Sequence, residues 1–243
     1  MKSIRPWLKL SLVVMVLIWY LSLLLIITAI SGRKTETGFR YRRKFCRSAL
    51  SILRINYSQS GAVQQGACLF VSNHRSMLDP LIQLGHIDTF ILSKAEVGTY
   101  PILGRGAKET GIILVHRHDH NSRKAALDAI DEKLRSGYPV LIYPEGTTKD
   151  GDLTGEFRKG AIEMAYQRRI PIVPVMIEYP DPGYYWTDGS LLDYFKRLFA
   201  TRKHHIVSGK IGLPIQSKSP GTIVSDTRAS IDAMILEARA HSI

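Results

Sequence analysis

The chain has 243 residues, of which 45% are hydrophobic and 22% are charged. These values exclude global disorder, and the length fits one globular domain with one short attachment. The formal net charge of +12 is uneven: residues 1–54 hold eleven Lys and Arg against one acid, and residues 55–243 hold twenty-two against twenty. A nucleic-acid binder would carry its basic face on the folded domain, so that class is disfavoured. The N-terminal block fits anionic lipid headgroups better, with a soluble basic tail as the alternative.

The first element expected is a membrane helix. From Leu10 to Ile30 the chain runs for 21 residues without a charge, enough to cross a hydrocarbon core of roughly 30 Å as a helix. A secretory signal peptide is the competing interpretation, but its apolar core is usually about 7–15 residues long. We therefore expect a retained span over about residues 8–30.

The charges that flank this segment predict its orientation. Three basic residues precede the span and seven follow it, and the seven are Arg33, Lys34, Arg40, Arg42, Arg43, Lys44 and Arg47. The positive-inside rule then places the rest of the chain in the cytoplasm, at the cytoplasmic membrane of a bacterium. Residues 39–55 mix basic and apolar side chains and predict an interfacial amphipathic helix with its apolar face in the lipid. Two alternatives stay open: this helix packs on the domain, or both helices form a hairpin in one leaflet.

After this anchor (residues 1–57), the rest of the chain (residues 58–243) alternates short apolar runs with helical patterns. This alternation predicts an α/β domain with a mostly parallel central sheet flanked by helices. A long surface loop is expected over Tyr179–Phe195. The expected strands are Ala67–Val71, Thr89–Leu92, Ile112–Val115, Val140–Tyr143, Ile172–Ile177 and Ile206–Gly209, and the expected helices are Ser76–Leu84, Ser122–Ser136, Arg158–Arg168 and Thr222–His241.

The strongest chemical signal is a histidine and an aspartate directly after the first expected strand. His74 and Asp79 lie in the run Asn73-His-Arg-Ser-Met-Leu-Asp-Pro80. A His with its pKa near neutrality suits the removal of a proton from an alcohol, and an Asp can hold its tautomer. Five steps of a regular helix leave two side chains roughly 140° apart. We therefore expect His74 in the turn before the helix, with Asp79 folding back from the first helical turn.

The same residues also have a structural interpretation. Ser76-x-x-Asp79 is a capping box, so Asp79 alone predicts no more than a helix cap. Gly146 allows close backbone approach to a ligand, or a plain turn. The alternating histidines of 116–120 raise the question of a metal site, but no further ligand set has recognisable spacing. Cys46 and Cys68 lack metal-motif spacing and imply no disulfide framework.

Four blocks in order, over roughly residues 65–180, resemble the glycerolipid acyltransferase family typified by lysophosphatidic acid acyltransferases. The family's first motif, Asn-His-x-x-x-x-Asp, matches Asn73, His74 and Asp79. The other matching blocks are Lys94 with Pro101–Gly104 and Gly111–Arg117, then Pro144-Glu-Gly-Thr147, then Ile170–Val175, and Phe157-Arg-Lys-Gly160 resembles the link between the last two.

The resemblance implies transfer of an acyl group from acyl-CoA or acyl carrier protein to a lysophospholipid, foremost 1-acylglycerol-3-phosphate, giving phosphatidic acid. It implies His74 and Asp79 as catalytic residues, membrane lipids as partners, and neither metal nor redox cofactor. A non-catalytic lipid-binding membrane protein of the same fold is the alternative of another class. The implied substrate-binding residues are Arg117, Glu145, Gly146, Thr147, Lys149 and Arg158.

One position departs from the family pattern. The third motif commonly reads Glu-Gly-Thr-Arg, and its Arg is associated with the phosphate of the acceptor. Here that position is Thr148, followed by Lys149, and a Lys does not replace a bidentate guanidinium contact. Lys149, Arg117 or Arg158 is expected to compensate. Alternatively, the acceptor is another lyso-lipid, with a zwitterionic or an amino-lipid headgroup.

Overall fold

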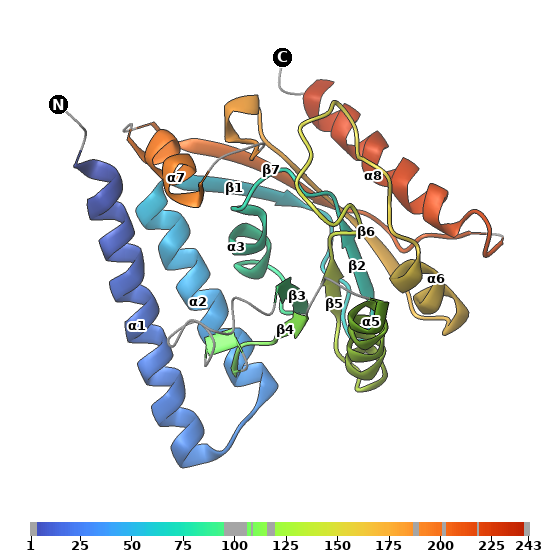
Figure 1. The fold of residues 1–243 in the computed structure, drawn as a ribbon, viewed down its shortest axis with the longest axis horizontal. Coiled ribbons are helices and arrows are strands. Elements are labelled where there is room, and N and C mark those ends of the chain that lie inside the picture. Colours follow the sequence, from blue (N-terminus) through green and yellow to red (C-terminus); the bar gives the residue numbers. More distant parts are fainter. Residues whose placement is uncertain are drawn as a thin grey trace.

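The computed structural model describes residues 4–94, 106–107, 109–115, 120–186, 190–200, 203–217 and 219–240. A seven-stranded sheet with the order β1-β7-β6-β2-β5-β3-β4 forms its centre (Figure 1). The strands are β1 (Ile55–Ser60), β2 (Leu69–Ser72), β3 (Phe90–Lys94), β4 (Ile112–Val115), β5 (Val140–Ile142), β6 (Ile172–Glu178) and β7 (His205–Ile211). The helices are α1 (Arg5–Ser31), α2 (Thr35–Leu53), α3 (Asp79–Leu84), α5 (His120–Arg135), α6 (Gly160–Gln167), α7 (Leu191–Phe199) and α8 (Ile223–Ala240), with the 3-10 turn η2 (Pro182–Tyr184).

The sheet is mostly parallel, as the sequence predicts. The strands β6, β2, β5, β3 and β4 pair in parallel, as do β1 and β7. Among the strands that the structure describes, the β6–β7 pair alone is antiparallel. All six strands expected from the apolar runs are present. Parallel strands need crossovers, and the connecting helices cover both faces of the sheet, so the α/β class is confirmed.

Alternation along the strands builds a core on each face of the sheet. In β2, Leu69 and Val71 pack with residues of α5, α6 and α8, whereas Phe70 packs with residues of α2 and α3. Figure 1 shows these two groups of helices on opposite sides of the strands. Successive side chains of a strand point to opposite faces, so β2 is buried on both. The loops that follow β2 and its neighbouring strands therefore extend from the buried core of the sheet.

The apolar face of α2 packs on the domain, which corrects the expectation that it lies in lipid. Cys46, Leu50 and Leu53 are buried against the sheet and α3. An amphipathic stripe has the same pattern whether its partner is lipid or a sheet, so the sequence alone did not separate the two. Several of its basic residues are likewise engaged with protein. Arg42 donates to the Thr110 carbonyl, Arg47 to the Gly85 carbonyl, and Arg43 pairs with Asp88.

The helix α1 lies antiparallel along α2 (Figure 1). It is the one described helix long and apolar enough to cross a membrane, with a mean hydropathy of 2.8 over its best window. Its inner side contacts α2, where the Tyr20 hydroxyl lies 3.3 Å from the Ser48 hydroxyl. Its outer side is an uncharged, almost wholly apolar stripe of exposed residues that we call the α1 stripe. The stripe comprises Trp7, Leu8, Ser11, Val14, Met15, Ile18, Trp19, Ser22, Ile26, Ala29 and Ile30.

Two elements were not expected from the sequence. The edge strand β1 pairs in parallel with β7 and spans residues 57 and 58, where we had placed the boundary between anchor and domain. The helix α7 lies inside and beyond the end of the expected loop Tyr179–Phe195, which also contains η2. β1 has only six residues, of which the last three are all polar, and α7 has only nine residues. Both are too short for a reliable periodic signal.

The packing of α2 can be tested by its effect on stability. Leu53→Ala should lower the free energy of unfolding by about 2–5 kcal/mol, because Leu53 is buried and its removal leaves a cavity. Arg40→Ala, on the exposed side of the same helix, should change it by no more than about 0.5 kcal/mol. Denaturant unfolding of the detergent-solubilised protein, followed by circular dichroism, measures both. Equal stabilities for the two variants would mean that the apolar face of α2 does not pack on the domain.

Candidate functional site

The candidate site lies where β2, β5 and β6 end. These three strands are adjacent and parallel in the order β6-β2-β5, so their carboxyl ends share one edge of the sheet. His74 follows β2, Glu145 follows β5 and Tyr179 follows β6. Open parallel sheets bind their ligands at this edge. The topology thus gathers residues from three distant parts of the chain.

His74 and Asp79 form a hydrogen-bonded pair. The His74 Nδ1 lies 2.8 Å from the Asp79 Oδ2. The helix α3 begins at Asp79, and His74 lies in the turn before it, as expected from the spacing of five residues. Asp79 is fully buried, whereas the His74 side chain retains 13% exposure. With Nδ1 held by the carboxylate, Nε2 is the ring nitrogen left to exchange a proton with a ligand.

The buried carboxylate of Asp79 accepts four hydrogen bonds. Besides His74, its Oδ2 accepts from the amides of Arg75 at 2.6 Å and Ser76 at 2.9 Å. Its Oδ1 accepts from the Tyr179 hydroxyl at 2.6 Å. Burial, followed by the charge of Asp79, raises the pKa of Tyr179 well above its usual value, so this hydroxyl keeps its proton and donates. Capping of the turn and orientation of His74 are therefore two tasks of one carboxylate.

The ring of His74 is also held from one side by Tyr143. The two rings stack with centroids 4.3 Å apart and planes inclined by 20°. The Tyr143 hydroxyl donates to the Gln83 side chain at 2.6 Å, and the Gln83 amide donates to the Ser72 hydroxyl at 2.7 Å. Because Gln83 and Ser72 are fully buried, this chain of bonds fixes the tyrosine. The imidazole is thus constrained by a carboxylate at its edge and an aromatic ring on its face.

Asn73 and Arg75 tie the motif loop to its neighbours through backbone groups. The Asn73 side chain donates to the Ile177 carbonyl at 2.8 Å and accepts from the Ile177 amide at 2.9 Å. The Arg75 guanidinium, 1% exposed, donates to the carbonyls of Lys149, Gly151 and Asp152. Hydrogen bonds of charged groups to backbone are stronger than neutral ones. The loop after β5 is therefore fastened to the loop that bears His74.

Glu145 makes a second connection between these loops. One carboxylate oxygen accepts from the His74 amide at 2.9 Å, and the other accepts from the Gly155 amide at 2.8 Å. The side chain is only 7% exposed. This geometry gives Glu145 a positioning task on the backbone of His74. Contact between Glu145 and a substrate, which the family resemblance implies, stays a prediction.

The remaining predicted binding residues surround Gly146. Gly146 has φ +75°, and a Cβ there would lie 2.7 Å from the Arg158 guanidinium carbon, so the arginine rests directly on the glycine backbone. Thr147 is exposed at the tip of this loop. The amide of Lys149 donates to the His74 carbonyl at 2.8 Å. The structure therefore brings Glu145, Gly146, Thr147, Lys149 and Arg158 together beside the loop of the His74–Asp79 pair.

Part of the prediction falls outside the described residues. Arg117, the Pro101–Gly104 block and residues 116–119 of the histidine run lie there. Among the residues that the structure does describe, no group of three or more His, Cys, Asp or Glu is placed to hold a metal ion. Arg117 consequently stays a candidate on sequence grounds alone.

An apolar cavity of about 420 Å³ borders the motif loop. Met77 and Pro80, which flank Asp79 in sequence, form part of its wall together with Leu81 and Leu84 of α3. The opposite walls come from α1 and α2, including Leu17, Leu21, Leu24, Tyr41 and Phe45. The α1–α2 hairpin therefore encloses, with α3, an apolar space that begins at the segment carrying the His74–Asp79 pair.

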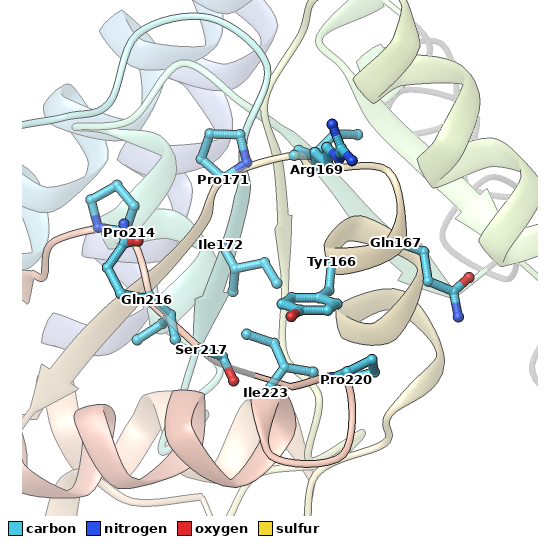
Figure 2. A pocket seen from close by; sticks show the side chains of 12 residues that line it. Tyr166, Gln167, Arg169, Pro171, Ile172, Pro214, Gln216, Ser217, Pro220 and Ile223 are labelled. Carbon is cyan, nitrogen blue, oxygen red and sulfur yellow. The ribbon is translucent and has the colours of Figure 1, made fainter.

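A larger cavity of about 630 Å³ lies at the opposite edge of the sheet (Figure 2). Ile172, the first residue of β6, lies in its wall, and Figure 2 shows Tyr166 and Ile223 on either side of the space. The described residues that line it include no His, Cys, Asp or Glu. Although this cavity is the larger of the two, we do not take it as the candidate active site. The His74–Asp79 pair lies at the opposite, carboxyl ends of the strands.

The Acyltransferase family model matches residues 54–178, just over half of the chain. The chain belongs to the acyltransferase family. The matched range contains β1 to β6 and the segments that carry His74, Asp79, Tyr143, Glu145 and Arg158. Tyr179 lies one residue beyond it, and the residues of α1 and α2 that enclose the apolar cavity precede it. The family resemblance expected from the four sequence blocks is confirmed.

Curated relatives of this acyltransferase chain carry more than one kind of name. The 1-acyl-sn-glycerol-3-phosphate acyltransferase of Helicobacter pylori is 32% identical over 149 residues, covering 60% of this chain and 62% of that protein. The lyso-ornithine lipid O-acyltransferase of Rhodobacter capsulatus is 30% identical over 154 residues, covering 59% of this chain and 55% of that protein. The chain thus spans less than two thirds of the length of either relative in these alignments.

A solved structure extends the likeness to the fold of almost the whole chain. The crystal structure of the 1-acyl-sn-glycerophosphate (LPA) acyltransferase PlsC from Thermotoga maritima superposes with a TM-score of 0.73 at 19% identity. The match covers 99% of this acyltransferase chain and 98% of that chain. The N-terminal helices are therefore part of the shared fold.

Sequence reasoning missed the residues that hold the pair in place. Tyr179 follows β6 in a segment expected to be a surface loop, yet it is 2% exposed and bonded to Asp79. Tyr143 was expected only as the last residue of a strand. Neither residue belongs to a spaced motif, so the one available signal was an aromatic side chain at the carboxyl end of a buried strand.

The bond from Tyr179 can be tested by its effect on stability. Tyr179→Phe leaves the buried Asp79 Oδ1 without this donor. The free energy of unfolding should therefore fall by about 1–3 kcal/mol, the cost of an unsatisfied buried acceptor. Denaturant unfolding followed by circular dichroism measures the change.

Tyr138→Phe is the matched control for this measurement. The Tyr138 hydroxyl donates to Glu36 at an exposed position, so its loss should change the free energy of unfolding by no more than about 0.5 kcal/mol. Equal stabilities of wild type and Tyr179→Phe would show that the Tyr179 hydroxyl does not help to hold Asp79.

Proposed function

We propose that this chain is an O-acyltransferase that transfers an acyl group from a thioester to the free hydroxyl of a lysophospholipid. The observation that carries the proposal is the His74–Asp79 pair, with a buried carboxylate on Nδ1 and a partly exposed imidazole at the ligand-binding edge of the sheet. This arrangement is suited to a general base with a fixed tautomer. The names of the curated relatives support the same reaction class.

In the proposed reaction, the His74 Nε2 takes the proton from the acceptor hydroxyl. The hydroxyl oxygen attacks the thioester carbonyl carbon and forms a C–O bond, and Asp79 stabilises the imidazolium. Collapse of the tetrahedral intermediate breaks the C–S bond, and the departing thiolate takes the proton back from His74. The ester and the free thiol are the products, and the balance requires neither metal nor redox cofactor. The acyl donor is acyl-CoA or acyl carrier protein.

The apolar cavity between α1, α2 and α3 supports a lipid substrate. Its wall includes Met77 and Pro80, which belong to the same loop and helix start as the pair. An acyl chain in this space would bring the polar end of the lipid to the motif loop. Apolar pockets beside a few placed polar groups are typical of lipid and cofactor sites.

We propose that α1 lies within one leaflet and does not cross the bilayer. The helix α1 runs along α2, and α2 is buried against the sheet, so an upright span would carry the flank of the domain into the hydrocarbon. The α1 stripe offers a continuous apolar surface along a helix about 40 Å long. The single-leaflet alternative of the sequence analysis is thereby kept for α1, but not for α2, whose apolar face packs on the domain. In this proposal the domain lies on the cytoplasmic face of a bacterial membrane.

For the acceptor, we propose 1-acylglycerol-3-phosphate with Arg158 as the cation that holds its phosphate. Arg158 rests on Gly146 in the loop joined to His74 through Glu145. A guanidinium can bind phosphate through two parallel bonds. It thus supplies the kind of contact that Thr148 cannot make. Lys149 is the second candidate in the same loop.

A second candidate acceptor is a lyso-lipid without phosphate. The relatives from Rhodobacter capsulatus and Pseudomonas aeruginosa are named lyso-ornithine lipid O-acyltransferases, at 30% and 34% identity. The Thr at position 148 favours this candidate, because it removes the cation that the family associates with phosphate.

Loss of the general base should abolish most turnover. His74→Ala is expected to lower kcat by about 10²–10⁴-fold with an unchanged unfolding temperature, and Asp79→Asn should lower it while lyso-lipid binding is kept. His204 is an exposed histidine directly before β7. His204→Ala is therefore the matched control and should remain active. The measurement is product formation from lyso-lipids and both thioester donors, identified by mass.

Near-normal transfer by His74→Ala at equal protein level would contradict the mechanism. A wild-type protein that binds lyso-lipid but transfers no acyl group from either donor would favour the non-catalytic lipid-binding alternative.

The acceptor assignment can be tested on a panel of lyso-lipids. Arg158→Ala should raise the KM for lysophosphatidic acid about ten- to a hundred-fold, since charged hydrogen bonds contribute roughly 1.5–3 kcal/mol. Lys159→Ala, adjacent but exposed and paired with Glu163, should change little. Thr148→Arg should also change little, because Arg158 already pairs the phosphate.

Two outcomes would change the assignment. If wild type prefers an acceptor without phosphate and Thr148→Arg shifts its preference toward lysophosphatidic acid, the second candidate is correct. If wild type prefers lysophosphatidic acid and is indifferent to losing Arg158 and Lys149, singly and together, the phosphate binds elsewhere.

A further inference from the structure

The helix α7 combines an anchored face with an exposed apolar one. Tyr194, Leu198 and Phe199 are buried in the core that also contains Leu50 and Leu53 of α2. Leu191 and Leu192, in its first turn, are exposed by 50% and 38%. Two adjacent exposed leucines on a helix that is otherwise well packed are unusual for a surface that meets only water.

This exposed side of α7 adjoins the α1 stripe. The Lys196 ammonium lies 5.4 Å from the ring centroid of Trp7, a residue of the stripe. The Lys9 ammonium lies 5.3 Å from the ring of Phe199, which also joins α1 to α7. Residues four apart share one face of a helix, so Leu192 lies on the face of α7 that meets Trp7 through Lys196. The apolar surface of α1 therefore continues onto α7.

The charges around this junction suit an anionic lipid surface. Lys196 and Arg197 lie in the last turn of α7, and Arg5 is the first residue of α1. The Lys9 ammonium is buried against Phe199 and is not part of this charged surface. The only acid on α7 is Asp193, and its negative charge is balanced by Lys196. The Asp193 Oδ1 lies 3.3 Å from the Lys196 ammonium, and its Oδ2 accepts from the Ser190 hydroxyl. Basic residues that border exposed leucines and a tryptophan are the composition of an interfacial membrane contact.

We propose that α7 is a second membrane-contact element, which docks Leu191 and Leu192 into an anionic lipid surface beside the N-terminal end of α1. The proposal rests on the proposed attachment through the α1 stripe and adds a contact made by the catalytic domain itself. The helix α7 follows β6 and Tyr179 along the chain. A membrane contact at α7 would therefore also orient the edge of the sheet that carries His74 and Asp79 relative to the membrane.

The test places a reporter at one position at a time in the full chain. Ile18→Cys on the α1 stripe, Leu192→Cys on α7 and Leu213→Cys carry an environment-sensitive fluorophore. Leu213 is 85% exposed just beyond the end of β7 distant from α7, so it is the matched control. The native thiols Cys46 and Cys68 are buried, and burial raises the pKa of each to about 12, so a surface thiol is labelled selectively. The labelled unsubstituted chain gives the background.

The vesicles contain equal parts of phosphatidylcholine and phosphatidylglycerol, with and without lipids that carry a spin-label quencher near the headgroup. We expect a blue shift and quenching at residues 18 and 192 and an unchanged spectrum at 213. A shift at 18 with a water-like spectrum at 192 overturns the α7 contact and keeps the attachment through α1. Water-like spectra at both positions overturn both proposals together.

A second measurement uses the partition of the unlabelled protein. Leu191→Ser with Leu192→Ser should weaken binding to these vesicles about ten-fold, by the apolar area withdrawn from lipid. Leu213→Ser should leave binding unchanged. Equal binding by the double variant and wild type, with matched unfolding temperatures, would also overturn the α7 contact.

Discussion

The placement of one buried carboxylate, Asp79, governs the architecture of the site. An ionised group removed from water costs several kcal/mol unless donors replace the lost hydration. The four donors to Asp79 are two amides of its own turn, the ring of His74 and the hydroxyl of Tyr179. Because they come from the segments after β2 and after β6, satisfying the carboxylate fixes both segments. The orientation of the imidazole follows from the same bonds.

Two further buried charges hold the loop after β5. Arg75 donates to three backbone carbonyls of that loop, and Glu145 accepts from backbone amides on both sides. An irregular loop has no ladder of its own, so side-chain charges satisfy its backbone groups. A site built in this way is already arranged before a ligand arrives, which is where much of the electrostatic contribution to catalysis arises.

The sequence predicted the strands and the turn geometry, which depend on local residue patterns. It did not predict the features that depend on contacts between distant segments. Apolar runs located six strands, and the spacing of His74 and Asp79 gave the turn geometry because a regular helix cannot bring them together. The partner of α2 was not predictable, because its stripe suits lipid and protein equally. Tyr179 was missed because its role depends on the adjacency of β6 and β2. The six residues of β1 form a sheet edge that pairs only with β7, near the opposite end of the chain.

The contact of Arg158 with Gly146 keeps the charge beside this turn separate from the His74–Asp79 pair. The reactive pair belongs to the segment after β2, whereas the guanidinium arrives from the start of α6 and rests on the turn after β5. A cation at residue 148 or one at residue 158 would approach the same glycine turn from different parts of the chain. Under the proposed role of Arg158, the charge that binds the headgroup can move between these two positions, or be lost, without disturbing Asp79. Lipid preference can then change by single substitutions on this turn while the His74–Asp79 pair stays as it is.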